Sequence, residues 1–321
     1  MTMTSPDTFR LLTRSDMDGL VSAVLLRELG MLGSVEFAHP KDMQDGLIQV
    51  NERDIITNLP YVEGCGLCFD HHSSEERRLD GRPTPGYVLE PNAKSAARVV
   101  YDFYGGLSAF PRIGLDMMEA VDKADSADFT REDVLEPKGW ALLSFLMDAR
   151  TGLGRFRDFR ISNYDLMMQL IDCCRDMGID EILALPDVAE RVALYREHHE
   201  RFVEQLQRVG EVHDNLVVLD LRGEEIIYAG NRFVVYALFP DCDISMHVMW
   251  GRARRNTVYT VGKSIFDRNN CVDVGELMLR HGGGGHHAAG TCQGPNERAD
   301  ELKSTLIDQI VTRSLRVRIT A

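Results

Sequence analysis

The sequence predicts an α/β protein with a parallel-sheet N-terminal domain and a smaller mixed α/β C-terminal domain, joined by a helical connector. Three observations support this prediction. The chain has 321 residues, of which 44% are hydrophobic, so it is long enough for two domains that each bury a core. Short apolar runs alternate with helix-like segments in its first part, which is typical of a parallel, doubly wound sheet. A long polar helix then precedes a strand-rich region.

Four short apolar runs, each bounded by polar or turn residues, are the predicted strands of the first domain. A helix is predicted between the first two runs, and it ends at Gly30. In parallel sheets the functional groups lie just past the carboxyl ends of the strands. The polar residues that follow each run are therefore the first candidates for a site. The predicted strands are 9–13, 35–38, 54–57 and 66–69, and the helix is 20–29.

The rest of the chain is predicted as a helical region at 95–178, a connector helix at 186–210 and a strand-rich second domain. Apolar residues recur every three or four positions along the connector, as in an amphipathic helix. Two helices are predicted after the strands, at VDVGELMLR and ERADELKSTLIDQIVT. The predicted strands of the second domain are NLVVLDL, RFVVYALF, DISMHVMW and NTVYTVGKSIF.

Composition narrows the possible functions. The 36 Lys and Arg and 50 Asp and Glu residues give a net charge of −14, which argues against a protein that coats long nucleic acid. An acidic protein can still bind a phosphorylated ligand if metal ions supply positive charge. Three features predict a cytoplasmic protein with reduced thiols. They are the seven cysteines, the absence of an apolar run of about 18–20 residues and a polar N-terminus.

The first group with chemical potential is the pair Asp16 and Asp18, which precedes Gly19 at the turn from the first predicted strand into the helix. Two carboxylates two residues apart on such a turn can converge on a divalent cation, which prefers oxygen ligands. The alternative is that they cap the helix, because Asp and Gly are common at helix starts. Taken alone, this pair favours the capping interpretation.

The second group is Asp70, His71 and His72, which follows the predicted strand at 66–69. An acid and two imidazoles at the tip of a buried strand are costly unless they bind something. One histidine can ligate a metal while the other donates a hydrogen bond to a phosphoryl oxygen. The alternative is a pair of exposed loop histidines, but the position after a strand and the preceding Asp favour a site.

The third group is the glycine-rich segment at 282–290, GGGGHHAAG. Consecutive glycines let backbone N–H groups approach an anion closely, as in phosphate-binding loops, and His286 adds a donor. The alternative is a flexible linker, which is less consistent with the amphipathic helix before the segment and the HHAAG sequence that ends it.

Cationic side chains gather ahead of this segment in a chain that is otherwise acidic. They either bind substrate phosphate or protect a solvated sheet edge from aggregation, and the pattern of the group favours neither reading. Lys263 is the member that we expect to contact substrate. The six residues are Arg252, Arg254, Arg255, Lys263, Arg268 and Arg280.

Together, the three groups resemble the motifs of the DHH phosphoesterase superfamily with its DHH-associated C-terminal domain. They run from residue 14 to residue 290, so the resemblance covers nearly the whole chain. The two-domain length is similar to that of the nanoRNase/pAp phosphatase and exopolyphosphatase-like branch. The resemblance implies a DHH catalytic domain at 1–185, a connector helix at 186–210 and a substrate-binding domain at 211–321.

The resemblance also implies a metal-dependent phosphoesterase that hydrolyses short oligonucleotides or small phosphorylated nucleotides with metal-activated water and Mn²⁺ or Mg²⁺ as cofactor. Two alternatives stay open: an exopolyphosphatase-like hydrolase of phosphoanhydrides, and a catalytically weakened protein that binds nucleotides or phosphate. Polyphosphate is a serious alternative because aromatic side chains that could stack on bases are sparse near the glycine-rich segment. The implied partner is a small phosphorylated substrate, without a membrane, and a homodimer is a possible assembly.

Two residues depart from the superfamily's pattern. Arg14 stands where a metal-binding His or Asp is usual, and Asn58 stands where an Asp often bridges two metal ions. These departures leave three outcomes open: a single metal, two metals with rearranged ligands, or a binding protein. Asp125 matches the Asp of the fourth motif, with Asp122 and Asp128 as near alternatives.

Carried over residue by residue, the resemblance assigns three sets of roles. The implied metal ligands are Asp16, Asp18, Asn58, His71 and Asp125. The implied catalytic groups are Asp18, His72 and Arg14, of which the last two stabilise phosphoryl oxygens. The implied substrate contacts are Lys263, Ser264, Gly283, Gly284, Gly285 and His286.

Overall fold

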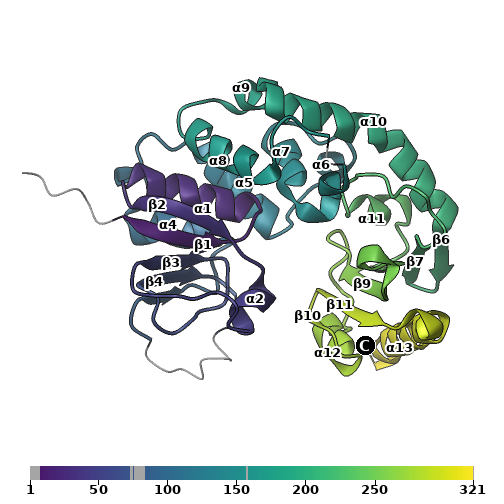
Figure 1. Cartoon of the computed structure of the whole chain (residues 1–321). Coiled ribbons are helices and arrows are strands. Elements are labelled where there is room, and N and C mark those ends of the chain that lie inside the picture. Colours follow the sequence, from purple (N-terminus) through teal and green to yellow (C-terminus); the bar gives the residue numbers. More distant parts are fainter. Residues whose placement is uncertain (1–7, 73–74, 76–83, 157, 321) are drawn as a thin grey trace, which may run out of the picture. The chain divides into compact units, whose positions relative to one another are not determined.

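The computed structural model describes residues 8–72, 75, 84–156 and 158–320, and the chain divides into two compact units. The first unit comprises Met1–Phe129 and Pro137–Ala193, and the second comprises Thr130–Glu136 and Leu194–Ala321. Helix α10 (Pro186–Val209) begins in the first unit and ends in the second (Figure 1). Each unit has its own sheet and its own hydrophobic core.

The first unit is built on a five-stranded sheet, β2-β1-β3-β4-β5, in which all neighbouring strands are parallel. The chain runs from β1 to β2 on one side and then to β3 on the other, so the strand order reverses between β1 and β3. Ligands of open parallel sheets bind at such a reversal, beyond the carboxyl ends of the strands. The strands are β1 (Phe9–Thr13), β2 (Leu32–Phe37), β3 (Asp54–Thr57), β4 (Leu67–Asp70) and β5 (Tyr87–Leu89).

These strands confirm the prediction of a parallel α/β domain. β1 and β3 have the predicted bounds, and β2 and β4 overlap the predicted runs. β5 was not predicted, because a half-buried edge strand of three residues is too short to show an alternating pattern.

Two threonines join the ends of β1 and β3. Thr13 Oγ1 donates to Thr57 O at 3.1 Å and accepts from Thr57 Oγ1 at 2.8 Å. Both residues are fully buried, and Leu12 and Ile56 pack in the core beside them. The two strands therefore give the loops that follow them a fixed starting position.

Helices cover this sheet and carry part of the site. α1 (Met17–Glu28) is buried from residue 17 to residue 26, which explains why its sequence is apolar on all sides. α4 (Ala96–Phe103) and α5 (Leu115–Asp125) both contact α1. Further helices in the described part of the unit are α2 (Pro40–Gln44), α7 (Gly139–Met147), α8 (Asn163–Cys173) and α9 (Ile179–Ala184).

The second unit is built on a six-stranded mixed sheet, β10-β11-β9-β8-β7-β6. β7 and β8 pair in parallel, and the other neighbouring strands pair antiparallel. The strands are β6 (Gly210–His213), β7 (Leu216–Asp220), β8 (Ile244–Trp250), β9 (Thr257–Lys263), β10 (Gly284–His286) and β11 (Ala289–Gly294).

Four helices complete the second unit. α12 (Val274–Arg280) and α13 (Ala299–Thr320) confirm the two predicted C-terminal helices and share a core with the sheet. α6 (Arg131–Leu135) contacts α11 (Val234–Leu238). Within the described ranges of the chain, no helix is long and apolar enough to cross a membrane.

The predicted strand at RFVVYALF is wrong, because this segment contains the short helix α11. Residues 234–237 of the helix are all buried, so the segment is apolar on every side and shows neither a strand nor a helix period. A short apolar run of this kind fits a buried strand and a buried helix equally well.

Candidate active site

Segments from distant parts of the first unit meet at the carboxyl edge of its sheet. The turn with the two acidic residues follows β1, Asn58 follows β3, and His71 and His72 follow β4. Asp125 arrives from a different direction, as the last residue of α5. Because parallel strands end at one edge of a sheet, residues that are far apart in the sequence lie close together here.

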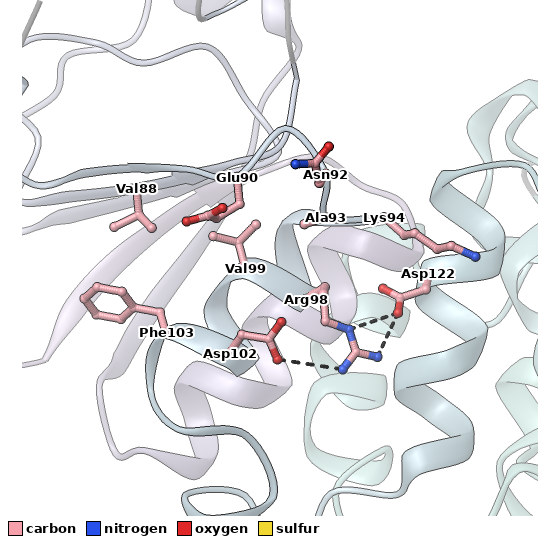
Figure 2. A pocket seen from close by; sticks show the side chains of 10 residues that line it. All are labelled: Val88, Glu90, Asn92, Ala93, Lys94, Arg98, Val99, Asp102, Phe103 and Asp122. Atoms are coloured by element: carbon pink, nitrogen blue, oxygen red, sulfur yellow. Dashed lines mark hydrogen bonds and ion pairs between the residues drawn. The ribbon is translucent and has the colours of Figure 1, made fainter.

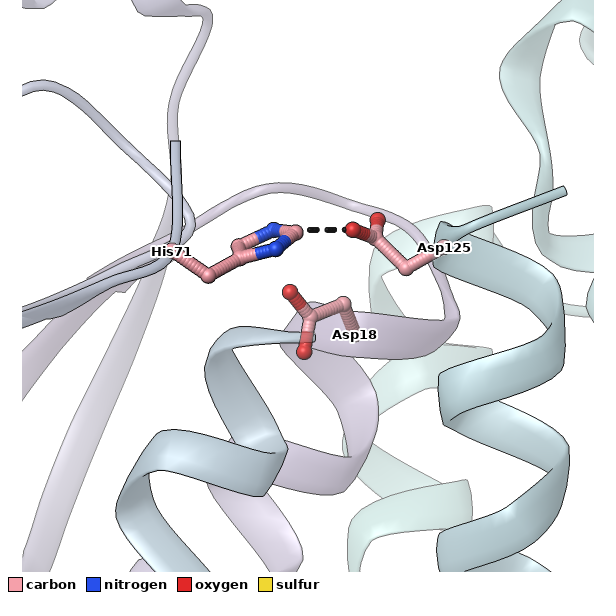
Figure 3. Close-up of side chains that lie close together, drawn as sticks. All are labelled: Asp18, His71 and Asp125. Carbon is pink, nitrogen blue, oxygen red and sulfur yellow. Dashed lines mark ion pairs between the residues drawn. The ribbon is translucent and has the colours of Figure 1, made fainter. Parts of the chain in front are cut away.

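Asp18, His71 and Asp125 form the centre of this group (Figure 3). One ligand-capable atom from each lies within 4.8 Å of the others. Asp18 is 1% exposed, and its carboxylate accepts hydrogen bonds from Ala97 N at 2.7 Å and Ala96 N at 3.0 Å. These two N–H groups at the start of α4 hold the buried carboxylate in place and stabilise its charge.

The His71 ring has a fixed orientation. Its Nδ1 lies 3.2 Å from the carbonyl oxygen of Ala93, so this nitrogen carries a proton and donates it. The other nitrogen, Nε2, lies 2.9 Å from Asp125 Oδ2 and forms an ion pair with it when the ring is protonated. Nε2 is therefore the ring atom that can ligate a cation, and a backbone carbonyl holds the ring in the tautomer that this requires.

Asp70 orients the second histidine. Its buried carboxylate accepts from the backbone N–H groups of His71 at 2.8 Å and His72 at 3.2 Å, and it lies 2.7 Å from His72 Nδ1. Tyr87 donates its hydroxyl to the other carboxylate oxygen at 3.3 Å. A carboxylate accepts hydrogen bonds, so His72 Nδ1 carries the proton. Nε2 of this half-exposed ring remains for a substrate.

Asp16 and Asn58 form a second group beside the first. Asp16 caps α1 by accepting from Gly19 N at 3.1 Å, so the capping alternative describes part of its role. The same carboxylate lies 3.2 Å from Arg14 Nε and accepts from Asn58 Nδ2 at 3.5 Å. Asn58 is 1% exposed, and its Oδ1 has no hydrogen-bond partner among the described residues. A buried oxygen without a partner beside a carboxylate suits a cation ligand.

Close packing explains why the residue after Asp18 is a glycine. A Cβ atom added at Gly19 would lie 1.9 Å from the carbonyl oxygen of Arg14. The first turn of α1 therefore packs directly against the loop that leaves β1, which brings Arg14 and both acidic residues to the same place.

The electrostatics of the site indicate a shortage of positive charge. Burial raises the pKa of Asp16 and of Asp18, and the Asp125 carboxylate raises the pKa of both further. Burial alone lowers the pKa of His71, but Asp125, Asp18 and Asp70 outweigh it and raise this pKa to about 9. A divalent cation at the centre would supply the missing charge and displace the proton from the imidazole. The residues therefore fit a metal ion.

Of the three aspartates considered from the sequence, Asp125, the last residue of α5, is the one at the centre. Asp122, one turn earlier, accepts from Arg98 Nη2 at 2.7 Å and Nε at 2.9 Å. Asp128 is largely exposed and lies 3.4 Å from Lys94 Nζ. The two alternatives considered from the sequence thus make ion pairs of their own.

Arg150 is a site residue that was not predicted. It lies in a 3₁₀ turn after α7, and its Nε donates to both carboxylate oxygens of Asp148, at 2.7 and 3.0 Å. Burial opposes its charge, but Asp148, Asp16 and Asp125 outweigh this and raise the pKa of Arg150. The guanidinium is therefore close enough to act on both acidic groups of the site. A lone arginine far along the chain carries no motif, so no sequence signal could have identified it.

The glycine-rich segment of the second unit forms the hairpin β10–β11 and is not a linker. A Cβ atom at Gly283 would lie 2.1 Å from Thr291 O, and one at Gly285 would lie 2.3 Å from Ala289 O. Internal packing therefore requires both glycines. An added Cβ at Gly284 meets no described atom within 4 Å, so internal contacts do not explain this glycine.

Lys263 and Ser264 make contacts inside the second unit. Lys263 is 8% exposed, and its Nζ donates to Asn270 O at 2.8 Å and lies 2.9 Å from His287 Nε2. Ser264 Oγ accepts from two of the backbone N–H groups that follow it. His286 is exposed, and its Nδ1 accepts from a backbone N–H at 3.2 Å. Contact of these residues with a substrate stays a prediction.

Comparison with known proteins assigns the chain to a family. No family model and no curated protein matches the chain. Among solved structures, the pGpG-specific phosphodiesterase PggH from Vibrio cholerae is 58% identical, with a TM-score of 0.82, over 95% of this chain and 100% of that chain. The chain belongs to the DHH phosphoesterase superfamily. RecJ from Thermus thermophilus, in complex with Mn²⁺, matches 94% of this DHH phosphoesterase and 52% of its own chain, with 14% identity and a TM-score of 0.50, which is a likeness in fold.

Membership in the superfamily confirms the prediction of a hydrolase that acts on phosphoester bonds. The structure of this DHH phosphoesterase adds a candidate centre for that chemistry. Asp18, His71 and Asp125 lie together at the carboxyl edge of the parallel sheet, and two arginines and a second histidine surround them.

Proposed function

We propose that this DHH phosphoesterase hydrolyses pGpG to two molecules of GMP. The observation that carries the proposal is its 58% identity, over 95% of the chain, to a pGpG-specific phosphodiesterase. In this reaction a new P–O bond forms to the oxygen of water, and the bond from phosphorus to the 3′ oxygen breaks. One proton of the water ends on the 3′ oxygen, so the reaction consumes one water for each diester bond.

The centre would hold Mn²⁺ or Mg²⁺ through Asp18, His71 and Asp125. A bound cation supplies a Lewis acid beside the attacking water and the phosphoryl oxygens. Asp16 and the unpartnered Oδ1 of Asn58 would provide a second and weaker place for a cation, because an amide oxygen brings no negative charge. The Ala96 and Ala97 N–H groups and the Ala93 carbonyl keep the first set of ligands in position.

Three side chains around the centre would bind the scissile phosphate. Arg14 and Arg150 place fixed positive charges beside the acidic groups, where they meet the negative charge that develops on the phosphoryl oxygens. Both are oriented by carboxylates, Arg14 by Asp16 and Arg150 by Asp148. His72, oriented through its Nδ1, would donate from Nε2 to a phosphoryl oxygen or to the departing 3′ oxygen.

The hairpin of the second unit would bind a phosphate group. Gly284 supports this role, because an added Cβ meets no described atom there and a backbone without a side chain can approach an anion closely. His286 and Lys263 would add donors to the same phosphate.

Turnover of pGpG tests the proposal, with Asp125→Asn as the decisive variant and Asp128→Asn as its matched control. Both substitutions remove one charge, but Asp125 belongs to the centre and Asp128 is largely exposed. We expect Mn²⁺-dependent formation of GMP by the wild type, a loss of roughly 10²-fold or more in Asp125→Asn, and nearly unchanged turnover in Asp128→Asn. The measurement is chromatographic separation of pGpG and GMP.

The same assay with polyphosphate and pAp in place of pGpG tests the alternatives considered from the sequence. Turnover of one of these and not of pGpG would contradict the proposal. Equal loss of activity in the two aspartate variants would contradict the assignment of the centre.

A further inference from the structure

A pocket of about 570 Å³ lies in the first unit beyond the carboxyl end of β5. Its walls come from the loop after β5, from α4 and from Asp122 on α5 (Figure 2). Figure 2 shows Val88 and Phe103 at one end and Lys94 with Asp122 at the other. Of the residues that line this pocket, Ala93 also contacts the metal centre, through the hydrogen bond between its carbonyl oxygen and His71.

The charge of the lining disfavours a phosphate. The pocket has three carboxylates against two cations. The Arg98 guanidinium is engaged by Asp122 at 2.7 Å and by Asp102 at 4.0 Å, and Lys94 lies 3.4 Å from Asp128. Because neighbouring acids already neutralise both cations, an anion would meet a net negative surface. A neutral ligand with hydrogen-bond donors fits this lining better.

Two polar side chains of the lining are available to such a ligand. The carboxylate of Glu90 and the side-chain amide of Asn92 make no hydrogen bond or ion pair with any residue in the described parts of the chain. Val88 and the buried Val99 add apolar surface, and Phe103 is 51% exposed. The pocket therefore combines an acceptor, an amide and a flat aromatic face, which is the composition expected of a nucleobase site.

The free carboxylate selects among the bases. Guanine presents two adjacent donors, N1–H and N2–H, which one carboxylate can accept together. The corresponding edges of adenine, cytosine and uracil have no two adjacent donors, so a carboxylate would face a lone pair. The Asn92 amide can donate to the O6 or N7 acceptors of guanine, and the Phe103 ring can stack on the base.

The loop between the pocket and the metal centre connects the two. Glu90, Asn92 and Ala93 all line the pocket, and Ala93 also positions His71 through its carbonyl oxygen. A few residues further on, the start of α4 holds Asp18. A base in the pocket would therefore lie one loop away from the scissile phosphate, which suits a nucleotide that occupies both places.

We propose that this pocket binds a guanine base of the substrate and gives the enzyme its preference for guanine dinucleotides. This inference rests on the proposed hydrolysis of pGpG. Glu90 accepts from the base edge, Asn92 donates to it, and Phe103 covers one of its faces.

The test compares Glu90→Gln with Glu119→Gln, the same substitution at an exposed position on α5 outside the pocket. Replacing the carboxylate by an amide keeps the size of the side chain and places a donor against the donors of guanine. We expect Glu90→Gln to raise KM for pGpG roughly tenfold or more, to leave KM for pApA nearly unchanged, and so to reduce the guanine preference. Glu119→Gln should behave as the wild type does. A guanine preference that stays within twofold of the wild type in Glu90→Gln would overturn the proposal.

Binding of guanosine to the metal-free protein separates this inference from the proposed function. Calorimetry should show that guanosine binds the wild type and binds Glu90→Gln at least tenfold more weakly, whether or not pGpG is the substrate. In the turnover assay guanosine should compete with pGpG. Equal affinity in both proteins, or inhibition that pGpG cannot reverse, would contradict the assignment of the pocket to a substrate base. Absence of pGpG turnover alongside Glu90-dependent guanosine binding would count against the proposed function and not against the pocket.

Discussion

Asn58 carries an amide at a position where an aspartate is usual in the superfamily. It is buried beside Asp16, adopts a left-handed backbone with φ of 54°, and has an unpartnered Oδ1 among the described residues. Asn and Asp both tolerate this backbone conformation, so Asn58→Asp adds a charge and replaces the Nδ2 donor to Asp16 without straining the backbone. The position therefore reports directly on how much negative charge the metal centre needs.

We predict that Asn58→Asp destabilises the metal-free protein and tightens the binding of Mn²⁺. A third carboxylate beside Asp16 and Asp18 is repelled when no cation is present, at a cost of roughly 1–3 kcal/mol, and a bound cation reverses this effect. Urea unfolding with EDTA measures the loss of stability, and urea unfolding with Mn²⁺ measures how far a bound cation reverses it. The same stability change under the two conditions would show that Asn58 does not face a cation.

Arg150 is expected to act on the phosphate and not on the fold. We predict that Arg150→Gln lowers kcat for pGpG by roughly 10²–10³-fold and leaves the unfolding midpoint nearly unchanged. Arg150→Lys should recover part of the rate, because it keeps the charge. Arg298→Gln, which also removes an arginine paired with a carboxylate, serves as the control. Unchanged kcat in Arg150→Gln would remove this residue from the site.

At the scale of elements, the hairpin β10–β11 separates glycines needed for packing from a glycine available to a ligand. We predict that Gly283→Ala destabilises the protein by roughly 1–3 kcal/mol, because the added Cβ overlaps Thr291 O. Gly284→Ala should fold with the stability of the wild type and raise KM for pGpG. Thermal unfolding and steady-state kinetics of the two variants distinguish these effects. Equal behaviour of the variants would argue against a phosphate contact at Gly284.

The elements also show where sequence patterns are informative. The strands that precede the site could be predicted because each is a short apolar run followed at once by polar residues, as Thr13 is by Arg14 and Phe69 is by Asp70. The segment that forms α11 could not be predicted, because a short run buried on all sides has no period. The glycine-rich segment was predicted only as a phosphate-binding loop. Its pairing as the hairpin β10–β11 could not be predicted, because the spacing of glycines does not reveal which strand they pair with.

At the scale of the whole molecule, the net charge of −14 limits the substrates that the enzyme can bind. Such a charge repels long polyanions, whereas a short substrate can be met by a cation and the two arginines at one place. Most of the candidate centre could be predicted, because parallel strands bring the residues after them to one edge. Arg150 and the pocket beyond β5 could not, since both depend on packing between helices and loops that no local pattern encodes.

A titration of Mn²⁺ into the wild type and Asp125→Asn tests whether the centre binds the catalytic metal. Bound metal is followed by electron paramagnetic resonance, and pGpG turnover is recorded in the same samples. We expect turnover to rise in proportion to bound Mn²⁺ and to disappear with EDTA, and we expect both binding and turnover to be weakened in Asp125→Asn. Turnover that persists in EDTA, or that is independent of Mn²⁺ bound at Asp125, would contradict a metal-dependent phosphodiesterase centred on Asp18, His71 and Asp125.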